Sequence, residues 1–157
     1  MLTYEPARES DVPLLFSLNR QLIDQYEDLA SVDYDRAVNW TYRSVLRNLP
    51  SFCRILWNGE LAGFYCLIRE EGKWELDSLF VLPPYQGKGI GTQVLTLCQQ
   101  QASPLFLYVF QKNTGALTLY QRMGFRIVKT VGTSRCRMKY TRPSRLAKFF
   151  LSNRRSC

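Results

Sequence analysis

The sequence predicts an α/β domain whose elements follow the order β-α-α-β-β-β-α-β-α-β-β. Three observations support this prediction. Apolar residues recur at helical spacing in some segments and form short continuous or alternating runs in others. The dipeptide Asn58-Gly59 separates two apolar runs, which is the strongest short signal of an antiparallel hairpin. A glycine-rich turn at residues 86–92 leads from an expected strand directly into an expected helix.

The first third of the chain predicts one strand and two helices. Residues 2–7 are expected to form the opening strand. A helix follows, because Asp11 and Pro13 are typical of a helix start. The apolar stripe of this helix consists of Leu14, Leu15, Leu18, Leu22 and Ile23, and the helix extends to about Tyr26. A second helix is expected over residues 34–49, where the next residue is a proline that ends it.

The middle of the chain predicts three antiparallel strands. Residues 52–57 and 61–68 flank the Asn58-Gly59 turn, and Glu71-Gly72 makes a second turn into a strand over 74–81. The remaining elements are a helix after the glycine-rich turn, a strand over 105–109, a helix over 114–123 and two closing strands over 125–131 and 135–140. Residues 141–157 form a basic tail, in which Ser144 is expected to begin a short helix.

The composition is that of an ordinary globular protein. The 157 residues are enough for one compact domain, which we expect over residues 1–140. No apolar run approaches the roughly 20 residues that cross a membrane, and the N-terminus does not resemble a signal peptide. Five scattered cysteines predict reduced thiols in a cytoplasmic protein. The absence of histidine excludes catalytic triads and metal sites that use this residue, and no metal is expected.

Charge is divided unevenly along the chain. Residues 1–77 contain 8 basic and all 13 acidic residues, for a net charge of −5, whereas residues 78–157 contain 13 basic residues and no acidic one. Such asymmetry suggests that the two halves meet partners of opposite charge. A phosphate-bearing ligand suits the basic half, and an amine suits the acidic half. Nucleic acid or an acidic membrane surface is the alternative partner for the basic half and its tail.

The turn at residues 86–92 predicts a phosphate-binding loop. Gly87, Gly89 and Gly91 alternate beside Lys88. Glycine lets backbone N–H groups turn toward one point, and a helix N-terminus adds unpaired donors with a partial positive charge. The spacing excludes two common loops. A dinucleotide fingerprint needs a third glycine where Thr92 stands, and a P-loop needs Ser or Thr after its lysine, where Gly89 stands.

The remaining pattern, Gln86-x-x-Gly89-x-Gly91, resembles the acetyl-CoA pyrophosphate loop of the GNAT superfamily of N-acetyltransferases. A second motif, Asn113-x-x-Ala116-x-x-x-Tyr120-x-x-x-Gly124-Phe125, follows in the order and at the separation seen in that superfamily. The resemblance covers about residues 2–140. It implies the GNAT fold, a central mixed and mostly antiparallel sheet flanked by helices, and an acetyl-CoA-dependent N-acetyltransferase.

The resemblance also implies which residues bind acetyl-CoA. The backbone from Gln86 to Gly91 would hold the pyrophosphate, with a hydroxyl from Thr92, and Tyr120 would be the general acid toward the coenzyme sulfur. The N–H of Val81 would polarise the acetyl carbonyl. The implied set is Leu79, Phe80, Val81, Gln86, Gly87, Lys88, Gly89, Ile90, Gly91, Thr92, Asn113 and Tyr120. The alternative interpretations are a helix cap for Asn113 and a core aromatic for Tyr120.

The catalytic base is expected among the carboxylates of the first half, since the chain has no histidine and no acidic residue after Asp77. Glu75 and Asp77 stand two apart on an expected strand and therefore share a face. The resemblance to the histone-acetylating branch of the superfamily favours Glu75, acting through a water, with Asp77 second. The alternatives are that one or both carboxylates merely pair with basic side chains or face solvent, and that a chain of waters alone removes the proton, as in many members of the superfamily.

The acceptor is predicted to be a small cationic amine, with polycations included. In the superfamily the first two helices and their connection border the acceptor site, and here carboxylates and aromatics occur there, with Tyr26, Asp33 and Asp35 as candidate contacts. A solvated acidic loop is the alternative interpretation. Other open alternatives are a protein N-terminus or lysine as acceptor, a homodimer formed through the tail, and a non-catalytic module that binds CoA or nucleic acid.

Overall fold

A computed structural model of the chain describes residues 1–143. Its strands are β1 (Leu2–Pro6), β2 (Phe52–Trp57), β3 (Glu60–Glu70), β4 (Lys73–Val81), β5 (Leu105–Phe110), β6 (Arg126–Val131) and β7 (Arg135–Tyr140). Its helices are α1 (Val12–Tyr26), α2 (Tyr34–Asn48), α3 (Ile90–Gln101) and α4 (Thr114–Arg122), with short 3-10 turns η1 (Glu9–Asp11), η2 (Leu49–Ser51) and η3 (Pro83–Tyr85). The predicted order of elements is confirmed. The helix expected from Ser144 lies outside the described residues.

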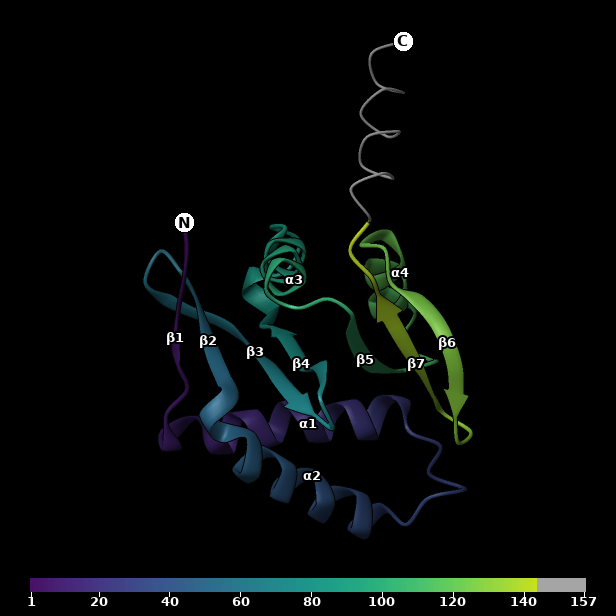
Figure 1. Cartoon of the computed structure of the whole chain (residues 1–157). Coiled ribbons are helices and arrows are strands. Elements are labelled where there is room, and N and C mark those ends of the chain that lie inside the picture. The colour runs from purple at the N-terminus through teal and green to yellow at the C-terminus, as the bar shows by residue number, and fades with distance from the viewer. Residues whose placement is uncertain (144–157) are drawn as a thin grey trace.

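The seven strands form one sheet in the order β1-β2-β3-β4-β5-β7-β6. All neighbouring pairs are antiparallel except β4 and β5. Helices α1 and α2 lie together on one side of the sheet, and α3 and α4 lie on the other (Figure 1). This arrangement is the mixed, mostly antiparallel sheet with flanking helices that the sequence predicts. Within the described residues, no helix has the length and apolar character needed to cross a membrane.

Two turns fix the register of β2, β3 and β4. Asn58 and Gly59 both have positive φ, as do Glu71 and Gly72, and this is the backbone conformation that a two-residue hairpin turn requires. Glycine is required for a second reason at Gly63 in β3, because a Cβ there would lie 1.9 Å from the carbonyl oxygen of Phe80. The backbones of β3 and β4 therefore approach each other closely just before β4 ends.

An apolar core covers each face of the sheet. On the side of α3 and α4, Ile90, Val94 and Leu95 pack against strand residues such as Leu105 and Leu107. On the side of α1 and α2, the smaller cluster consists of Leu15, Val45, Phe52, Phe64 and Cys66. These residues are almost fully buried. The two cores hold the sheet rigidly between the helices, so that the ends of its central strands are fixed in position.

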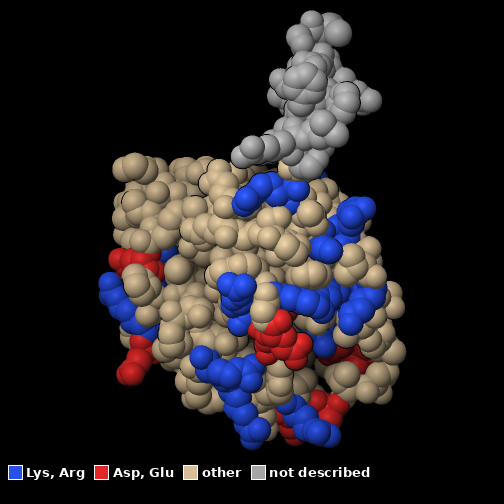
Figure 2. All heavy atoms as spheres, viewed as in Figure 1, with Lys and Arg blue, Asp and Glu red and all other residues tan. Residues whose placement is uncertain are grey.

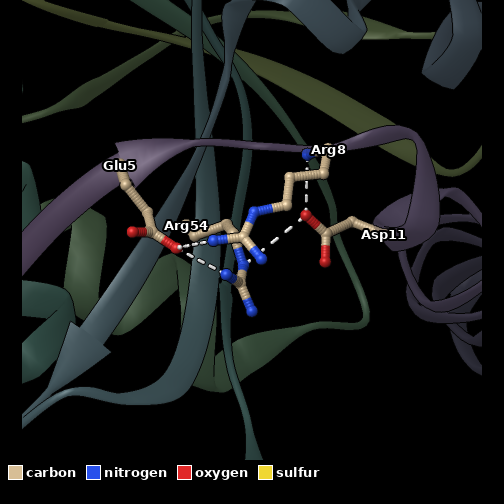
Figure 3. A network of polar contacts seen from close by, with 4 residues as sticks. All are labelled: Glu5, Arg8, Asp11 and Arg54. Carbon is tan, nitrogen blue, oxygen red and sulfur yellow. Dashed lines mark hydrogen bonds and ion pairs between the residues drawn. The ribbon is translucent and has the colours of Figure 1, made fainter.

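A polar network joins the beginning of the chain to β2 (Figure 3). Arg54 in β2 contacts the carboxylate of Glu5 in β1, and its Nε lies 3.5 Å from Oδ2 of Asp11. The same Asp11 oxygen accepts a 2.8 Å hydrogen bond from the backbone N–H of Arg8. Asp11 is buried and immediately precedes α1. The network therefore anchors the start of α1 to the sheet edge.

Candidate active site

The sheet opens between its two central strands, β4 and β5. Within the described residues these strands pair at Trp74 with Leu105 and at Glu75 with Phe106, and no further pairing joins them toward the end of β4. Residues Leu79, Phe80 and Val81 are bonded to β3 along one edge of β4. Their other edge has no strand partner in the part of the chain that the structure describes. This open edge contains the three strand residues that the resemblance to the GNAT superfamily implies as acetyl-CoA contacts.

A cavity of about 560 Å³ adjoins this opening. Its wall is formed by side chains from α1, α2, the β3–β4 turn, β4, β5, α4 and β7. Of the predicted site residues it brings together Glu75, Asp77, Leu79, Phe80, Asn113 and Tyr120. Segments that are far apart in the sequence thus meet around one space, and residues predicted as base and acid both line it.

The glycine-rich loop follows β4 and leads into α3. Gly87 and Gly89 have φ values of +77° and +78°, and a Cβ at either position would meet nothing within 4 Å, so the loop surface is open. The first helical bond of α3 runs from the N–H of Gln93 to the carbonyl of Gly89, 3.1 Å away. Among the described residues, the N–H groups of residues 87–92 have no hydrogen-bond acceptor. Unpaired N–H groups at a helix start are suited to a pyrophosphate.

The side chains of this loop differ in what they do. The amide Nε2 of Gln86 donates a 2.9 Å hydrogen bond to the carbonyl of Val81, which closes the loop onto the end of β4. Gly91 faces Leu119 of α4, and a Cβ there would lie 3.3 Å from it. Lys88 is exposed. Gln86 and Gly91 therefore shape the loop, while Lys88 contributes positive charge at its surface.

Glu75 and Asp77 both line the cavity, although β4 does not alternate regularly between them. Cys66 and Leu67 in β3 pair with Ser78 and Leu76, which leaves Asp77 as the extra residue of a β-bulge. A bulge bends its strand and redirects its side chains. Here it keeps both carboxylates on the cavity, and Ser78 donates a 3.2 Å hydrogen bond to Oδ2 of Asp77.

The environment raises the pKa of both carboxyl groups. Desolvation is the largest cause for Glu75, followed by the negative charges of Asp77 and Glu70, and together they raise its pKa to about 7. Arg137 and Arg135 act in the opposite direction. Asp77 borders the open cavity, yet surrounding protein atoms desolvate its carboxylate and raise its pKa as well. A carboxyl group with a pKa near neutrality is suited to accept a proton from an amine.

Tyr120 and Asn113 come from α4 and its N-terminus. Oδ1 of Asn113 accepts a 3.3 Å hydrogen bond from the N–H of Ala116, so the residue is the helix cap of the alternative interpretation. Its side-chain NH₂ is left to donate to a ligand. Tyr120 packs edge-on against Phe125, with 5.7 Å between ring centroids. Desolvation raises the pKa of Tyr120 to about 12, so its hydroxyl keeps its proton at neutral pH.

The three predicted substrate contacts lie outside the cavity wall. Tyr26 packs against Phe110 in a tilted arrangement with 6.4 Å between ring centroids, and Asp33 caps α2 by accepting a 3.1 Å hydrogen bond from the N–H of Arg36. Asp35 is exposed in the first turn of the same helix. The acidic connection between α1 and α2 instead contacts the β6–β7 turn. Thr133 donates a 2.8 Å hydrogen bond to Asp28, and Ser134 donates one to Glu27.

Basic residues of β7 also line the cavity, and they belong to none of the sequence motifs. Arg135 and Arg137 face the cavity from the strand next to β5. The guanidinium of Arg137 lies 4.4 Å from the ring centroid of Phe106 and 5.3 Å from that of Tyr108. The signal was present in the sequence, because arginines alternate with buried Cys136 and Met138 and alternation predicts that they share one face.

Comparison with known proteins identifies the class of fold and then the family. The PaiA N-acetyltransferase of Thermoplasma acidophilum, solved in complex with coenzyme A, superposes with a TM-score of 0.67 over 90% of this chain and 99% of that chain, at 19% identity. The sequence pattern of the Acetyltransferase (GNAT) family matches residues 16–125, well over half of the chain. The chain belongs to this family. The predicted family, fold and enzyme class, an acetyl-CoA-dependent N-acetyltransferase, are thereby confirmed.

Two relatives differ in the acceptor that their names state. The chain is 26% identical over 127 residues to the peptidyl-lysine N-acetyltransferase YjaB of Salmonella typhimurium, an alignment covering 81% of this chain and 85% of the relative. It is 35% identical over 86 residues to the spermine/spermidine N(1)-acetyltransferase of Bacillus subtilis, which covers 46% of this chain and 57% of the relative. The second likeness thus spans little more than half of the relative.

Proposed function

We propose that this acetyltransferase moves the acetyl group of acetyl-CoA to the primary amine of a small molecule that arrives as a cation. The single observation that supports the proposal best is the cavity, because Glu75 and Asp77 from β4 line it together with Tyr120 from α4. The glycine-rich loop supports acetyl-CoA as the donor, since its open surface and unpaired N–H groups suit a pyrophosphate.

The proposed reaction forms a bond between the amine nitrogen and the acetyl carbon and breaks the carbon–sulfur bond of the thioester, which acetyl-CoA supplies. Glu75 accepts the proton that the amine loses, through a water, with Asp77 as the second candidate base. A pKa of about 7 leaves Glu75 substantially ionised at neutral pH and able to take that proton. Tyr120 donates its proton to the departing thiolate. The N–H of Val81 would stabilise the carbonyl oxygen as negative charge develops on it.

The acidic side of the cavity supports an amine acceptor. Glu70, Glu71, Glu75 and Asp77 all line it. These carboxylates replace Asp33 and Asp35 as candidate contacts for the ammonium group. Relatives named for spermine and spermidine agree with an amine of this kind. A peptide lysine is the second candidate acceptor, because the relative aligned over 81% of this chain is named a peptidyl-lysine N-acetyltransferase.

The test is mass-spectrometric detection of acetyl transfer from acetyl-CoA to a panel of polyamines, amino acids, amino sugars and lysine peptides. We expect acetylated product from a small amine. The Tyr120→Phe variant removes the proposed acid and should lower kcat about 100-fold, within the usual range for general acid catalysis. Its acetyl-CoA affinity, measured by calorimetry, should stay within about twofold of the wild-type value.

Three outcomes would each contradict a part of the proposal. Product from peptides alone would replace the small amine with a peptide lysine. Acetyl-CoA binding without product from any acceptor would favour a non-catalytic module. If Tyr120→Phe retained full kcat, the departing thiolate would have to take its proton from another group.

A further inference from the structure

The cavity also has a basic side, opposite in charge to the carboxylates of β4. Arg135 and Arg137 line it from β7, and both guanidiniums lie within electrostatic range of Glu75. Figure 2 shows basic side chains gathered over the half of the sheet that contains β5, β6 and β7, beside an acidic group near the β3–β4 turn. A ligand in this cavity therefore meets carboxylates on one side and guanidiniums on the other.

These arginines have no carboxylate partner in the described part of the chain. The three ion pairs found among residues 1–143 all belong to the network of Glu5, Arg8, Asp11 and Arg54. In Arg137 the Nε atom is buried and has no hydrogen-bond acceptor among residues 1–143. A buried donor without an acceptor loses the hydrogen bonds that it makes with water in the unfolded chain. Arg137 lines the cavity, so the other donors of its guanidinium can meet an acceptor atom that a ligand brings.

Aromatic rings fix the position of the Arg137 guanidinium. Phe106 and Tyr108 in β5 hold it by cation–π contacts at 4.4 and 5.3 Å from their ring centroids. Arg135 lies 5.5 Å from the Tyr108 centroid. A guanidinium held in place in this way presents its planar donor pattern to a carboxylate at little entropic cost, which a flexible lysine does not.

The register of the strands sets the distance between the acidic and the basic side of the cavity. Glu75 in β4 pairs with Phe106 in β5, and Tyr108 in β5 pairs with Arg137 in β7. Since β5 alone separates β4 from β7, their backbones lie roughly 10 Å apart. Both side chains line the cavity, and the separation of their backbones leaves space for a small ligand between their charged ends. An amine and a carboxylate a few bonds apart would satisfy both ends.

We propose that the acceptor of this enzyme is a zwitterion, an amine that also carries a carboxylate, and that Arg137 with Arg135 binds this carboxylate while Glu75 receives the amine. The inference rests on the proposed acetyl transfer and narrows its acceptor. It separates amino-acid-like acceptors, which carry both groups, from diamines and polyamines, which carry no carboxylate.

The experiment uses matched acceptor pairs that differ by one carboxylate: lysine with cadaverine, ornithine with putrescine, and arginine with agmatine. Acetylation is measured by mass spectrometry, and calorimetry measures the binding of each compound to the enzyme with CoA. We expect kcat/KM for the amino acid to exceed that for its decarboxylated partner. In Arg137→Gln this preference should fall about tenfold or more, and acetyl-CoA affinity should not change. Arg137→Lys, which keeps the charge but loses the planar fork, should restore only part of the preference.

Arg126→Gln is the matched control, because Arg126 is exposed on β6 and is not part of the cavity wall. Equal activity on both members of each pair, or preference for the diamines, would overturn the zwitterion inference and leave acetyl transfer standing. A loss of acetyl-CoA affinity in Arg137→Gln would also overturn it. If neither these compounds nor the wider acceptor panel is acetylated, the proposed function fails, and the calorimetric binding measurement still decides the inference. Binding of the amino acids that Arg137→Gln weakens would support it, and no binding would overturn it.

Discussion

At the scale of single residues, Glu75 shows how position changes chemistry. The side chain is half-buried beside Asp77 and near Glu70, and its pKa rises from 4.5 to about 7. The two arginines of β7 limit this rise. A glutamate on an exposed strand would be ionised but too weak a base, whereas a fully buried one would remain protonated. The partial burial of Glu75 at the cavity gives it a pKa between these two cases.

The pH dependence of the rate should reflect this pKa. The base must be ionised to accept a proton, so kcat/KM should rise about tenfold per pH unit below about pH 7 and level off above it. Glu75→Gln should lose this limb and reduce kcat/KM about 100-fold or more at pH 8. Glu9→Gln, which changes an exposed glutamate in η1, is the control and should leave the profile unchanged. A limb near pH 7 that persists in Glu75→Gln would assign the base to another group.

The raised pKa of Glu75 makes stability fall with pH, whereas it makes the rate rise with pH. Between pH 4.5 and about 7 the folded chain holds a proton on Glu75 that the unfolded chain has released, so the free energy of unfolding falls as pH rises through this window. Glu75→Gln has no carboxyl group to ionise, so its free energy of unfolding does not fall in this way. Its melting temperature should exceed that of the wild type at pH 8, and the difference should shrink toward pH 4.5. Scanning calorimetry across this range measures it, and an equal difference at every pH would contradict the assignment.

At the scale of elements, the sequence predicts strand and helix positions to within one or two residues wherever turn chemistry is local. Asn58-Gly59 and Glu71-Gly72 both adopt the positive φ values that hairpin turns need. The strand order could not be predicted from local pattern, because β7 inserts between β5 and β6 through pairings between distant residues. The bulge at Asp77 also depends on how β3 pairs with β4, and no local signal marks it.

In the candidate site, too, some residues have a local sequence signal and others depend on long-range packing. Gln86, Gly89, Asn113 and Tyr120 belong to motifs of fixed spacing, and the sequence identifies them. The substrate contacts do not belong to a motif. Which acidic residues reach the cavity depends on how α1 and α2 lie across the sheet, and this is set by packing and by the contacts of Glu27 and Asp28 with the β6–β7 turn.

Gly63 provides a test of the close approach of β3 to β4. In Gly63→Ala the new Cβ would overlap the Phe80 carbonyl oxygen, and the two strands would have to separate. We expect a loss of about 3 kcal/mol in the free energy of unfolding, at the upper end of overpacking effects. Gly115→Ala is the matched control, because a Cβ at this helical position meets nothing within 4 Å. It should be neutral or more stable by about 0.5–1 kcal/mol. Urea denaturation measures both, and equal stability of the two variants would refute the packing account.

At the scale of the whole molecule, the acidic connection between α1 and α2 contacts a distant segment of the chain. The sequence analysis places candidate substrate contacts in this connection. Hydrogen bonds from Ser31 and then Thr133 lower the pKa of Asp28, which keeps its carboxylate ionised. The connection is thereby attached to the β6–β7 turn. Glu27 and Asp28 of this connection thus bind the β6–β7 turn. The acidic residues that face the cavity come instead from β3, β4 and the turn between them.

The double variant Asp33→Asn/Asp35→Asn tests this division. Neither residue lines the cavity, so KM for the acceptor amine should stay within about twofold of the wild-type value, as expected for exposed charges in solvent. Steady-state kinetics with the best acceptor of the panel measures it. Glu70→Gln removes a carboxylate that does line the cavity and should raise KM. A large increase in KM from the double variant alone would return the acceptor site to the α1–α2 connection.

The two residue pairs that join β4 to β5 have a consequence for the response of the molecule to salt. The junction lies where the charge of the chain changes sign, since Asp77 in β4 is its last acidic residue. The sheet therefore consists of an acidic part and a basic part that meet along its weakest seam. Salt screens attraction across this seam, since the Debye length is about 8 Å at physiological ionic strength. Raising the ionic strength should therefore weaken the attraction between the two parts, while the apolar cores keep the strand ends in place.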